Sequence, residues 1–328
     1  MSASILARMT MANFTSVVRR TSLVCCSLLA LATAVTTQAQ NEIGAQIGTE
    51  QDVLRRGERQ TTQREIPFRL TDPELGEIDV VSRAPRPKMF TFSTDQNLLY
   101  TSNAFLARNN DQNTFFWNGR FAGSFVPYAT RNFTPRLTFE QNFFRYDKFS
   151  QLDFDSNSLQ LDVKYDLDRD DTSFINVSYT GSRLYTPRGD AGEFYKYGLL
   201  NASFTHVRPL GSTPLRAIAS VGSNWRHGDP SEFDRATLYV NGVLVYSPID
   251  TVQVIGFIRP EVQFYLHDPD SDSRTDLTVT AGVSFVWTPI EYFSLGTTAT
   301  VTGNYSTTGE NEYDVFLPSV FVSGRFAF

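Results

Sequence analysis

The sequence predicts an all-β protein, an antiparallel up-and-down transmembrane β-barrel of about 12 strands with an irregular N-terminal arm. The first observation is that apolar and polar residues alternate from residue 88 onward, most clearly over residues 159–167 and 277–287. The second is that turn-forming residues separate these alternating blocks at nearly even intervals. Because neighbours on a strand point to opposite faces, such blocks present one face to lipid and the other to the barrel interior.

The N-terminus reads as an export signal. Arg19 and Arg20 precede an apolar run over residues 21–35, which has the length of a signal-peptide core. Residues 37–39 fit a small-x-small cleavage site, so we expect residues 1–39 to be removed.

The expected mature chain is acidic and has no cysteine. The whole chain has 29 basic and 35 acidic side chains, and residues 1–39 contain basic residues but no acid. Cys25 and Cys26 lie inside the signal, which leaves no disulfide or thiol chemistry. An acidic exported protein is a poor candidate for binding nucleic acid. The mean hydropathy of −0.25 does not argue against a barrel, because alternation averages the hydropathy away.

Residues 40–87 differ from the rest in composition, with many charges, few aromatic residues and no sustained period. They predict a periplasmic arm or a small plug, partly helical over residues 50–64 or else disordered. This arm is the segment that we expect to meet a periplasmic or envelope partner. Residues 88–328 form the expected barrel.

The alternating blocks give 12 strands, an even number as bacterial single-chain barrels require, although ten or 14 strands also remain compatible with the pattern. The expected strands cover residues 89–101, 113–126, 133–147, 156–167, 172–185, 194–208, 214–227, 233–247, 251–267, 274–288, 291–306 and 313–328.

The connections fall into two sets. Short turns with Pro or Asp occur at residues 168–171, 209–214, 247–250 and 288–290, and slightly longer polar connections alternate with them. With both termini in the periplasm, the short set faces the periplasm and the longer set faces outside.

Aromatic residues gather where two interfacial belts are expected. Phe115, Trp117 and Trp225 mark the outer belt, and Trp287, Tyr292 and Phe293 mark the inner one.

The polar faces of the strands supply the lumen. By alternation the charged lumen-lining residues are Asp95, Arg120, Glu140, Asp162, Lys164, Arg216, Arg259, Glu261 and Arg325. Both signs are present, so no single-sign ladder selects one class of ion. Either the lumen conducts small solutes, or ion pairs cross it and close it; alternation gives the face of a side chain and not its partner.

The last block, residues 313–328, places Val320, Val322, Gly324, Phe326 and Phe328 on one face. It resembles the closing strand of outer-membrane β-barrels, in which a C-terminal Phe serves as the assembly signal. The resemblance implies an outer-membrane location and assigns that role to Phe326 and Phe328. It also implies contact with outer-membrane lipid, lipopolysaccharide and the outer-membrane assembly machinery.

The sequence contains no pattern for catalysis. None of His206, His227 and His267 has the serine two residues later that outer-membrane phospholipases need. Asp268, Asp270 and Asp272 are weak candidates for a divalent cation, because the glycine and the closing glutamate of a calcium loop are missing. We expect no enzyme activity and no cofactor.

Two functions follow from this pattern. The first is a porin-like channel for small polar solutes. The alternative is a structural or accessory outer-membrane barrel whose N-terminal arm binds a periplasmic or envelope partner.

Overall fold

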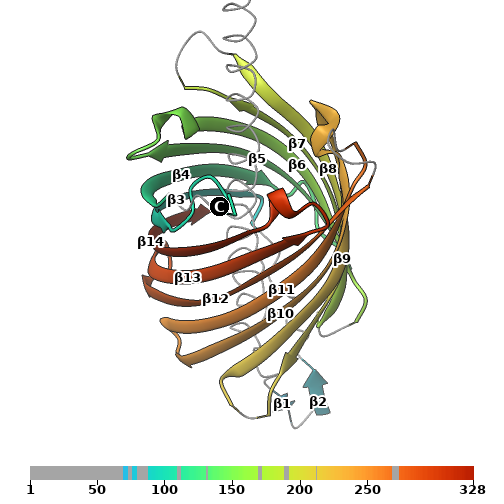
Figure 1. Ribbon diagram of the computed structural model, residues 1–328. Helices are drawn as coiled ribbons and strands as arrows, with labels where there is room; N and C mark the ends of the chain where they lie inside the picture. Colours follow the sequence, from blue (N-terminus) through green and yellow to red (C-terminus); the bar gives the residue numbers. More distant parts are fainter. Residues whose placement is uncertain are drawn as a thin grey trace, which may run out of the picture.

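Twelve antiparallel strands close into a single barrel (Figure 1). The computed structural model describes residues 69–72, 76–79, 88–108, 112–130, 132–168, 172–187, 192–211, 213–267 and 273–328. The barrel strands are β3 (Phe90–Thr101), β4 (Thr114–Phe125), β5 (Phe133–Tyr146), β6 (Phe154–Asp166), β7 (Ser173–Tyr185), β8 (Glu193–Pro209), β9 (Leu215–Asp229), β10 (Arg235–Ile249), β11 (Val252–Tyr265), β12 (Arg274–Ile290), β13 (Phe293–Ser306) and β14 (Tyr313–Ala327). The predicted fold class and strand number are confirmed.

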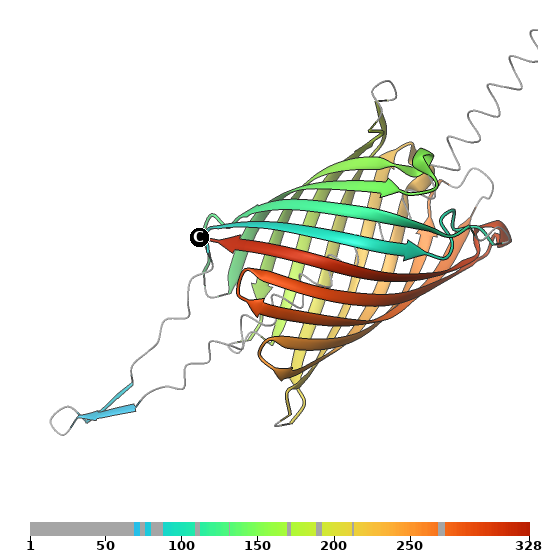
Figure 2. The ribbon, with the colours of Figure 1, turned by 90° about the vertical axis from the view of Figure 1, so that its left-hand side faces the viewer.

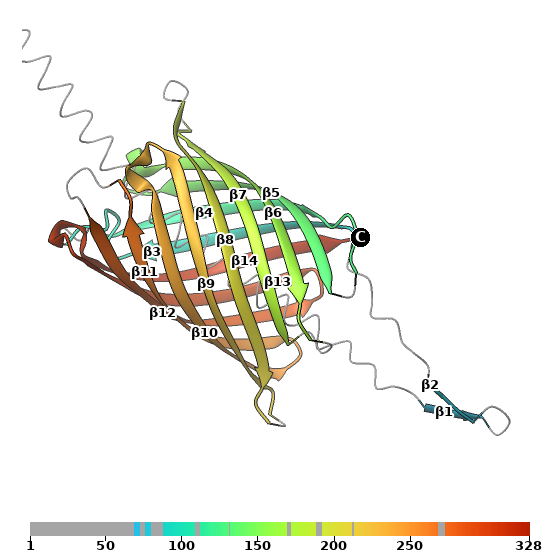
Figure 3. The ribbon, with the colours of Figure 1, turned by 90° about the vertical axis from the view of Figure 1, so that its right-hand side faces the viewer.

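The two ends of the barrel differ in their connections. One end, called the turn end below, carries Phe90, Phe328 and the short turns such as the one between β10 and β11. The opposite end, called the loop end, carries three 3-10 helices, η1 (Ser150–Leu152), η2 (Ser231–Phe233) and η3 (Gly309–Asn311). Figure 3 shows the tilted strands running between the two ends on the side of β7 to β11.

Every bound of the 12 barrel strands lies within two residues of the expected one. β10 begins at Arg235, because η2 takes up the preceding residues of the connection from β9. Within the expected arm, β1 (Arg69–Asp72) and β2 (Gly76–Asp79) pair as an antiparallel sheet of their own. The expected signal at residues 1–39 and the expected helix at residues 50–64 lie outside the described residues.

The pleat of each strand separates two kinds of side chain. Apolar residues such as Leu161 and Val320 are more than half exposed on the outer face. Polar residues such as Thr298, Thr300 and Thr302, at every second position of β13, are buried on the inner face. The described residues include no helix with the length and apolarity needed to cross a membrane.

Apolar side chains also line part of the interior, in two clusters. The loop-end apolar cluster joins inward residues of β3 to β8 and β14 to residues of three loop-end connections. Its members are Leu99, Ala104, Leu106, Phe116, Phe144, Tyr146, Leu152, Phe154, Leu184, Tyr195, Phe233, Val315 and Leu317. A smaller cluster at the turn end comprises Ile218, Val243, Val245, Ile255 and Phe257.

The barrel closes where β14 pairs with β3, which lie side by side in Figure 2. Phe90 and Phe328 exchange two backbone hydrogen bonds, each with an N···O distance of 3.0 Å. The Phe90 ring also stacks on Phe328, with ring centroids 6.1 Å apart, and on Phe125, with centroids 5.0 Å apart. Phe326 stacks on Tyr292 with centroids 6.0 Å apart. Phe328 therefore joins the two strands of the seam, and Phe326 contacts the turn between β12 and β13.

We expect deletion of residues 326–328 to reduce the fraction of closed barrel, and Phe328→Ala to reduce it less. The deletion removes ring contacts and seam hydrogen bonds, whereas the substitution removes only the ring. The closed fraction is measured as heat-modifiable mobility on electrophoresis after refolding in detergent. Ala327→Ser, an inward change on the same strand, is the control; equal yields for all three variants would contradict this role.

Candidate functional site

The interior wall is the candidate functional site. Strand parity places all nine charged residues expected in the lumen on the inward face of their strands. Asp95, Asp162, Arg259 and Glu261 are buried, whereas Arg216 and Arg325 are half-buried towards the turn end.

One polar network crosses β3, β4, β5 and β14. Arg120 Nη1 lies 2.9 Å from Asp95 Oδ2, and Arg120 Nη2 lies 2.6 Å from Glu140 Oε2. Ser323 Oγ donates a hydrogen bond to Asp95 Oδ1. The pairing arises because Asp95 and Arg120 are direct cross-strand partners. One guanidinium thus bridges two carboxylates, with one terminal nitrogen directed at each.

A second polar network lies on the inner face of β10 to β13. Arg259 Nε donates to Glu261 Oε2 at 3.1 Å, and Gln263 Nε2 donates to Glu261 Oε1 at 2.6 Å. Arg259 also lies over the Tyr239 ring, 4.1 Å from its centroid. Hydroxyl and amide groups of β12 and β13 extend this polar wall, with Thr280 and Thr302 hydrogen-bonded at 3.1 Å.

Lys164 is held along β6. Its Nζ lies 2.6 Å from Asp166 Oδ1 and 4.6 Å from the centroid of the Phe174 ring on β7. As in the other networks, the partners come from the same strand or from a neighbouring strand.

This arrangement bears on whether ion pairs cross the lumen. The inward ion pairs Asp95–Arg120, Arg120–Glu140, Lys164–Asp166, Arg259–Glu261 and Arg274–Asp276 each join side chains of one strand or of adjacent strands. These five pairs therefore run along the wall.

Three inward arginines at the loop end were not among the expected site residues. Arg226, Arg235 and Arg274 lie at the loop end, beside Tyr197 and Tyr265. Each is at or near the end of its strand, where the alternation merges into loop sequence. The signal that could have identified them is the repeated arginine at the loop-end limits of β9, β10 and β12.

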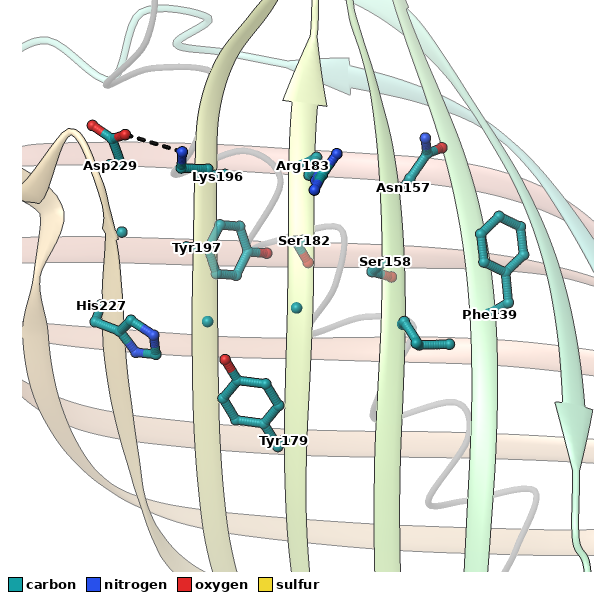
Figure 4. A pocket seen from close by; sticks show the side chains of 14 residues that line it. Phe139, Asn157, Ser158, Tyr179, Ser182, Arg183, Lys196, Tyr197, His227 and Asp229 are labelled. Carbon is teal, nitrogen blue, oxygen red and sulfur yellow. Dashed lines mark ion pairs between the residues drawn. The ribbon is translucent and has the colours of Figure 1, made fainter.

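The outer wall carries a groove of about 530 Å³ across β5 to β9 (Figure 4). It forms where Gly181 and Gly198 are cross-strand partners and leave a gap between larger side chains such as Tyr179 and His227. Figure 4 shows Lys196 and Asp229 at its edge, with Nζ and Oδ2 3.2 Å apart. Because this cation is already matched by an acid, the groove edge has little net charge with which to select a ligand.

A serine–histidine pair was also not expected. Ser173 Oγ lies 2.9 Å from His206 Nδ1, on exposed cross-strand partners at the turn end. Asp168, in the adjacent turn, accepts hydrogen bonds from Thr172 N and Oγ1, which lower the pKa of its carboxyl to about 2. The acid thus caps the turn and lies beside the serine, whereas nucleophilic catalysis needs an acid that orients the histidine.

No group of three or more potential metal ligands occurs within the described part of the chain. Asp268, Asp270 and Asp272, the weak metal candidates, lie outside it.

No protein-family model and no curated protein matches the sequence. Among solved structures, an outer membrane channel from Pseudomonas putida F1 is similar at 13% identity and a TM-score of 0.51, covering 78% of this chain and 100% of that chain. The translocator domain of autotransporter NalP from Neisseria meningitidis is similar at 12% identity and a TM-score of 0.42, covering 73% of this chain and 88% of that chain. The NanC porin is similar at 9% identity and a TM-score of 0.43, covering 70% and 98%. The first likeness establishes the fold alone, and the other two are too weak to add to it: this chain has the fold of the outer-membrane β-barrels.

We expect Arg120→Gln to lower the free energy of unfolding by about 3–5 kcal/mol, because it removes the cation shared by two largely buried carboxylates. The measurement is urea unfolding of protein refolded into lipid vesicles. Arg208→Gln, an exposed arginine on β8, should change the value by no more than about 0.5 kcal/mol. Adding Asp95→Asn and Glu140→Gln to Arg120→Gln should recover much of the loss; no recovery would contradict the electrostatic explanation.

Proposed function

We propose that this protein is an outer-membrane channel that lets small polar solutes pass through its lumen. The observation that supports this proposal most directly is the position of the inward ion pairs. The two partners of each pair lie beside one another on the wall. Such pairs hold charged side chains against the strands and keep them from reaching across the interior. Hydroxyl groups of β12 and β13 supply further hydrogen-bonding partners for a hydrated solute.

The proposed location rests on the two faces of the barrel. The outer face is apolar over its middle, and aromatic residues lie on it near both ends, with Trp225 at the loop end and Trp287 at the turn end. Lipid and lipopolysaccharide would cover this surface. In the proposed orientation the turn end faces the periplasm, and Phe326 and Phe328 meet the assembly machinery there.

The role is proposed to be non-enzymatic and to need no cofactor. The exposed Ser173–His206 pair is the nearest approach to catalytic geometry in the described residues. The pair supports no reaction in this arrangement, because Asp168 caps the turn and does not orient the histidine.

A second candidate function is an accessory barrel whose arm, residues 40–87, binds a periplasmic or envelope partner. The observation that favours it is the separate β1–β2 sheet within the arm. A two-stranded sheet has two unpaired edges, and a partner strand can add to either edge through backbone hydrogen bonds.

The channel is tested by single-channel recording of the mature protein in planar bilayers. We expect discrete conductance steps, and we expect Thr300→Trp to lower them because Thr300 points inward at the middle of β13. Val301→Trp is the matched control, since Val301 is the adjacent outward residue. A folded wild-type barrel that shows no conductance would remove the channel proposal and leave the accessory role.

The membrane-facing wall is tested by moving one arginine by one residue. Leu161→Arg should lower the free energy of unfolding in vesicles by roughly 2–4 kcal/mol, because the cation would face lipid near mid-membrane. Gln160→Arg, on the inward face of the same strand, should cost much less. Equal losses for the two variants would mean that the register of β6 is wrong.

A further inference from the structure

The outward side chains of β5 to β9 form rows across the wall, because the outward residues of adjacent strands stand opposite one another. One row consists of Phe139, Leu159, Gly181, Gly198 and His227, each the cross-strand partner of the next. We call these five residues the notch row. The two glycines interrupt the row at β7 and β8, and all five residues line the groove of about 530 Å³ (Figure 4).

The two glycines of the notch row differ in what surrounds them. A Cβ at Gly198 would collide with the His227 ring and with the Tyr179 hydroxyl, so these two side chains lie over Gly198. Their rings stack with centroids 6.4 Å apart. A Cβ at Gly181, in contrast, would meet no atom within 4 Å. The open part of the groove therefore lies over Gly181.

The rows on either side of the notch row differ in polarity. The next outward row towards the turn end is apolar and consists of Leu137, Leu161, Tyr179, Leu200 and Trp225, all of them exposed. The next outward row towards the loop end is polar and consists of Gln141, Asn157, Arg183, Lys196 and Asp229. The groove thus lies where the outer wall changes from apolar to polar, and Trp225 stands beside it as expected at a membrane interface.

The charges of the polar row are matched. Lys196 Nζ lies 3.2 Å from Asp229 Oδ2, and Arg183 Nε lies 3.6 Å from Glu193 Oε2. Exposed ion pairs of this kind contribute little free energy, and the four charges cancel. An occupant of the groove is therefore selected by its apolar part, while its polar part meets a rim that offers donors and acceptors of both signs.

We infer that the groove binds one membrane lipid, with an acyl chain over Gly181 and along the apolar row and with the headgroup against the polar row. An amphipathic molecule in this orientation matches the change of polarity across the notch row. A hydrocarbon chain would supply the contacts that the wall over Gly181 lacks. The groove is continuous with the wall that the proposed location places in lipid, so the inference rests on that location and is independent of conduction.

The test is native mass spectrometry of the mature protein in a non-ionic detergent, titrated with dimyristoyl phosphatidylcholine. We expect saturable retention of one lipid. Dimyristoyl phosphatidylglycerol has the same chains and a net negative headgroup, and its affinity should lie within about threefold. Glycerophosphocholine, the headgroup without chains, should not compete. Retention of no lipid, competition by glycerophosphocholine, or a tenfold preference for either headgroup would overturn the inference.

The variant is Gly181→Leu, which places a side chain in the open part of the groove. It should weaken lipid binding at least about tenfold, a difference of about 1.4 kcal/mol. The control is Gly123→Leu, at an outward glycine of β4 outside the groove, where a Cβ would also meet no atom within 4 Å. The control should bind lipid as the wild type does. Heat-modifiable mobility shows that each variant is a closed barrel.

Gly181→Ala fills less of the groove, so its loss of affinity should be smaller than that of Gly181→Leu, and it serves if the leucine variant does not fold. Wild-type affinity in a folded Gly181→Leu variant, or an equal loss in the control, would mean that the groove holds no lipid. A wild-type dimer in sedimentation, dissociated by Gly181→Leu, would assign the groove to a second copy of the chain and overturn the lipid site.

This inference and the proposed channel fail separately. A barrel that conducts ions in bilayers but retains no lipid loses the lipid site and keeps the channel. Lipid retention that is lost in Gly181→Leu, in a barrel that does not conduct, keeps the site and removes the channel.

Discussion

The structure depends on one constraint: neighbouring residues of a strand must point to opposite sides of a wall that is one sheet thick. The residues of each strand therefore form two alternating sets, one that faces the surroundings of the barrel and one that faces its interior. In β6 these are the exposed Leu159 and Leu161 on one side and the buried Asp162 on the other. Since a slip by one residue would exchange the two faces, the apolar outer face also fixes the register of every strand.

The same constraint explains how much the sequence could predict. Alternation predicted the strands, their number and the face of nine charged residues, because these depend only on position along one strand. It could not predict partners, because a partner depends on the register between strands. Asp95 and Arg120 are 25 residues apart and become neighbours only through the length of the β3–β4 connection. The opposition of Arg226 and Arg235 was missed for the same reason, and η2 between β9 and β10 determines it. Ser173 and His206, 33 residues apart, are a further example.

The interior combines two chemistries that a simple water-filled pore does not need together. Bridged ion pairs such as Asp95–Arg120–Glu140 make the middle of the wall polar, with charges of both signs. The loop end is divided between aromatic side chains and arginines. In the proposed channel, a solute entering at the loop end would meet these aromatic side chains and arginines before it reaches the polar wall.

The seam between β3 and β14 has a consequence for the order in which the protein can fold. Asp95 and Ser323 are hydrogen-bonded although 228 residues separate them. β3 is synthesised early, yet the edge of β3 that pairs with β14 has no partner until β14 has been synthesised and reaches it. The entropic cost of closing a loop grows only slowly with its length, so the length of the chain between the two strands adds little to the cost of pairing them. The time for which the edge of β3 stays unpaired is the greater risk. Throughout that interval the unpaired edge of β3 could pair with a strand of another chain, which is the aggregation risk of any exposed sheet edge.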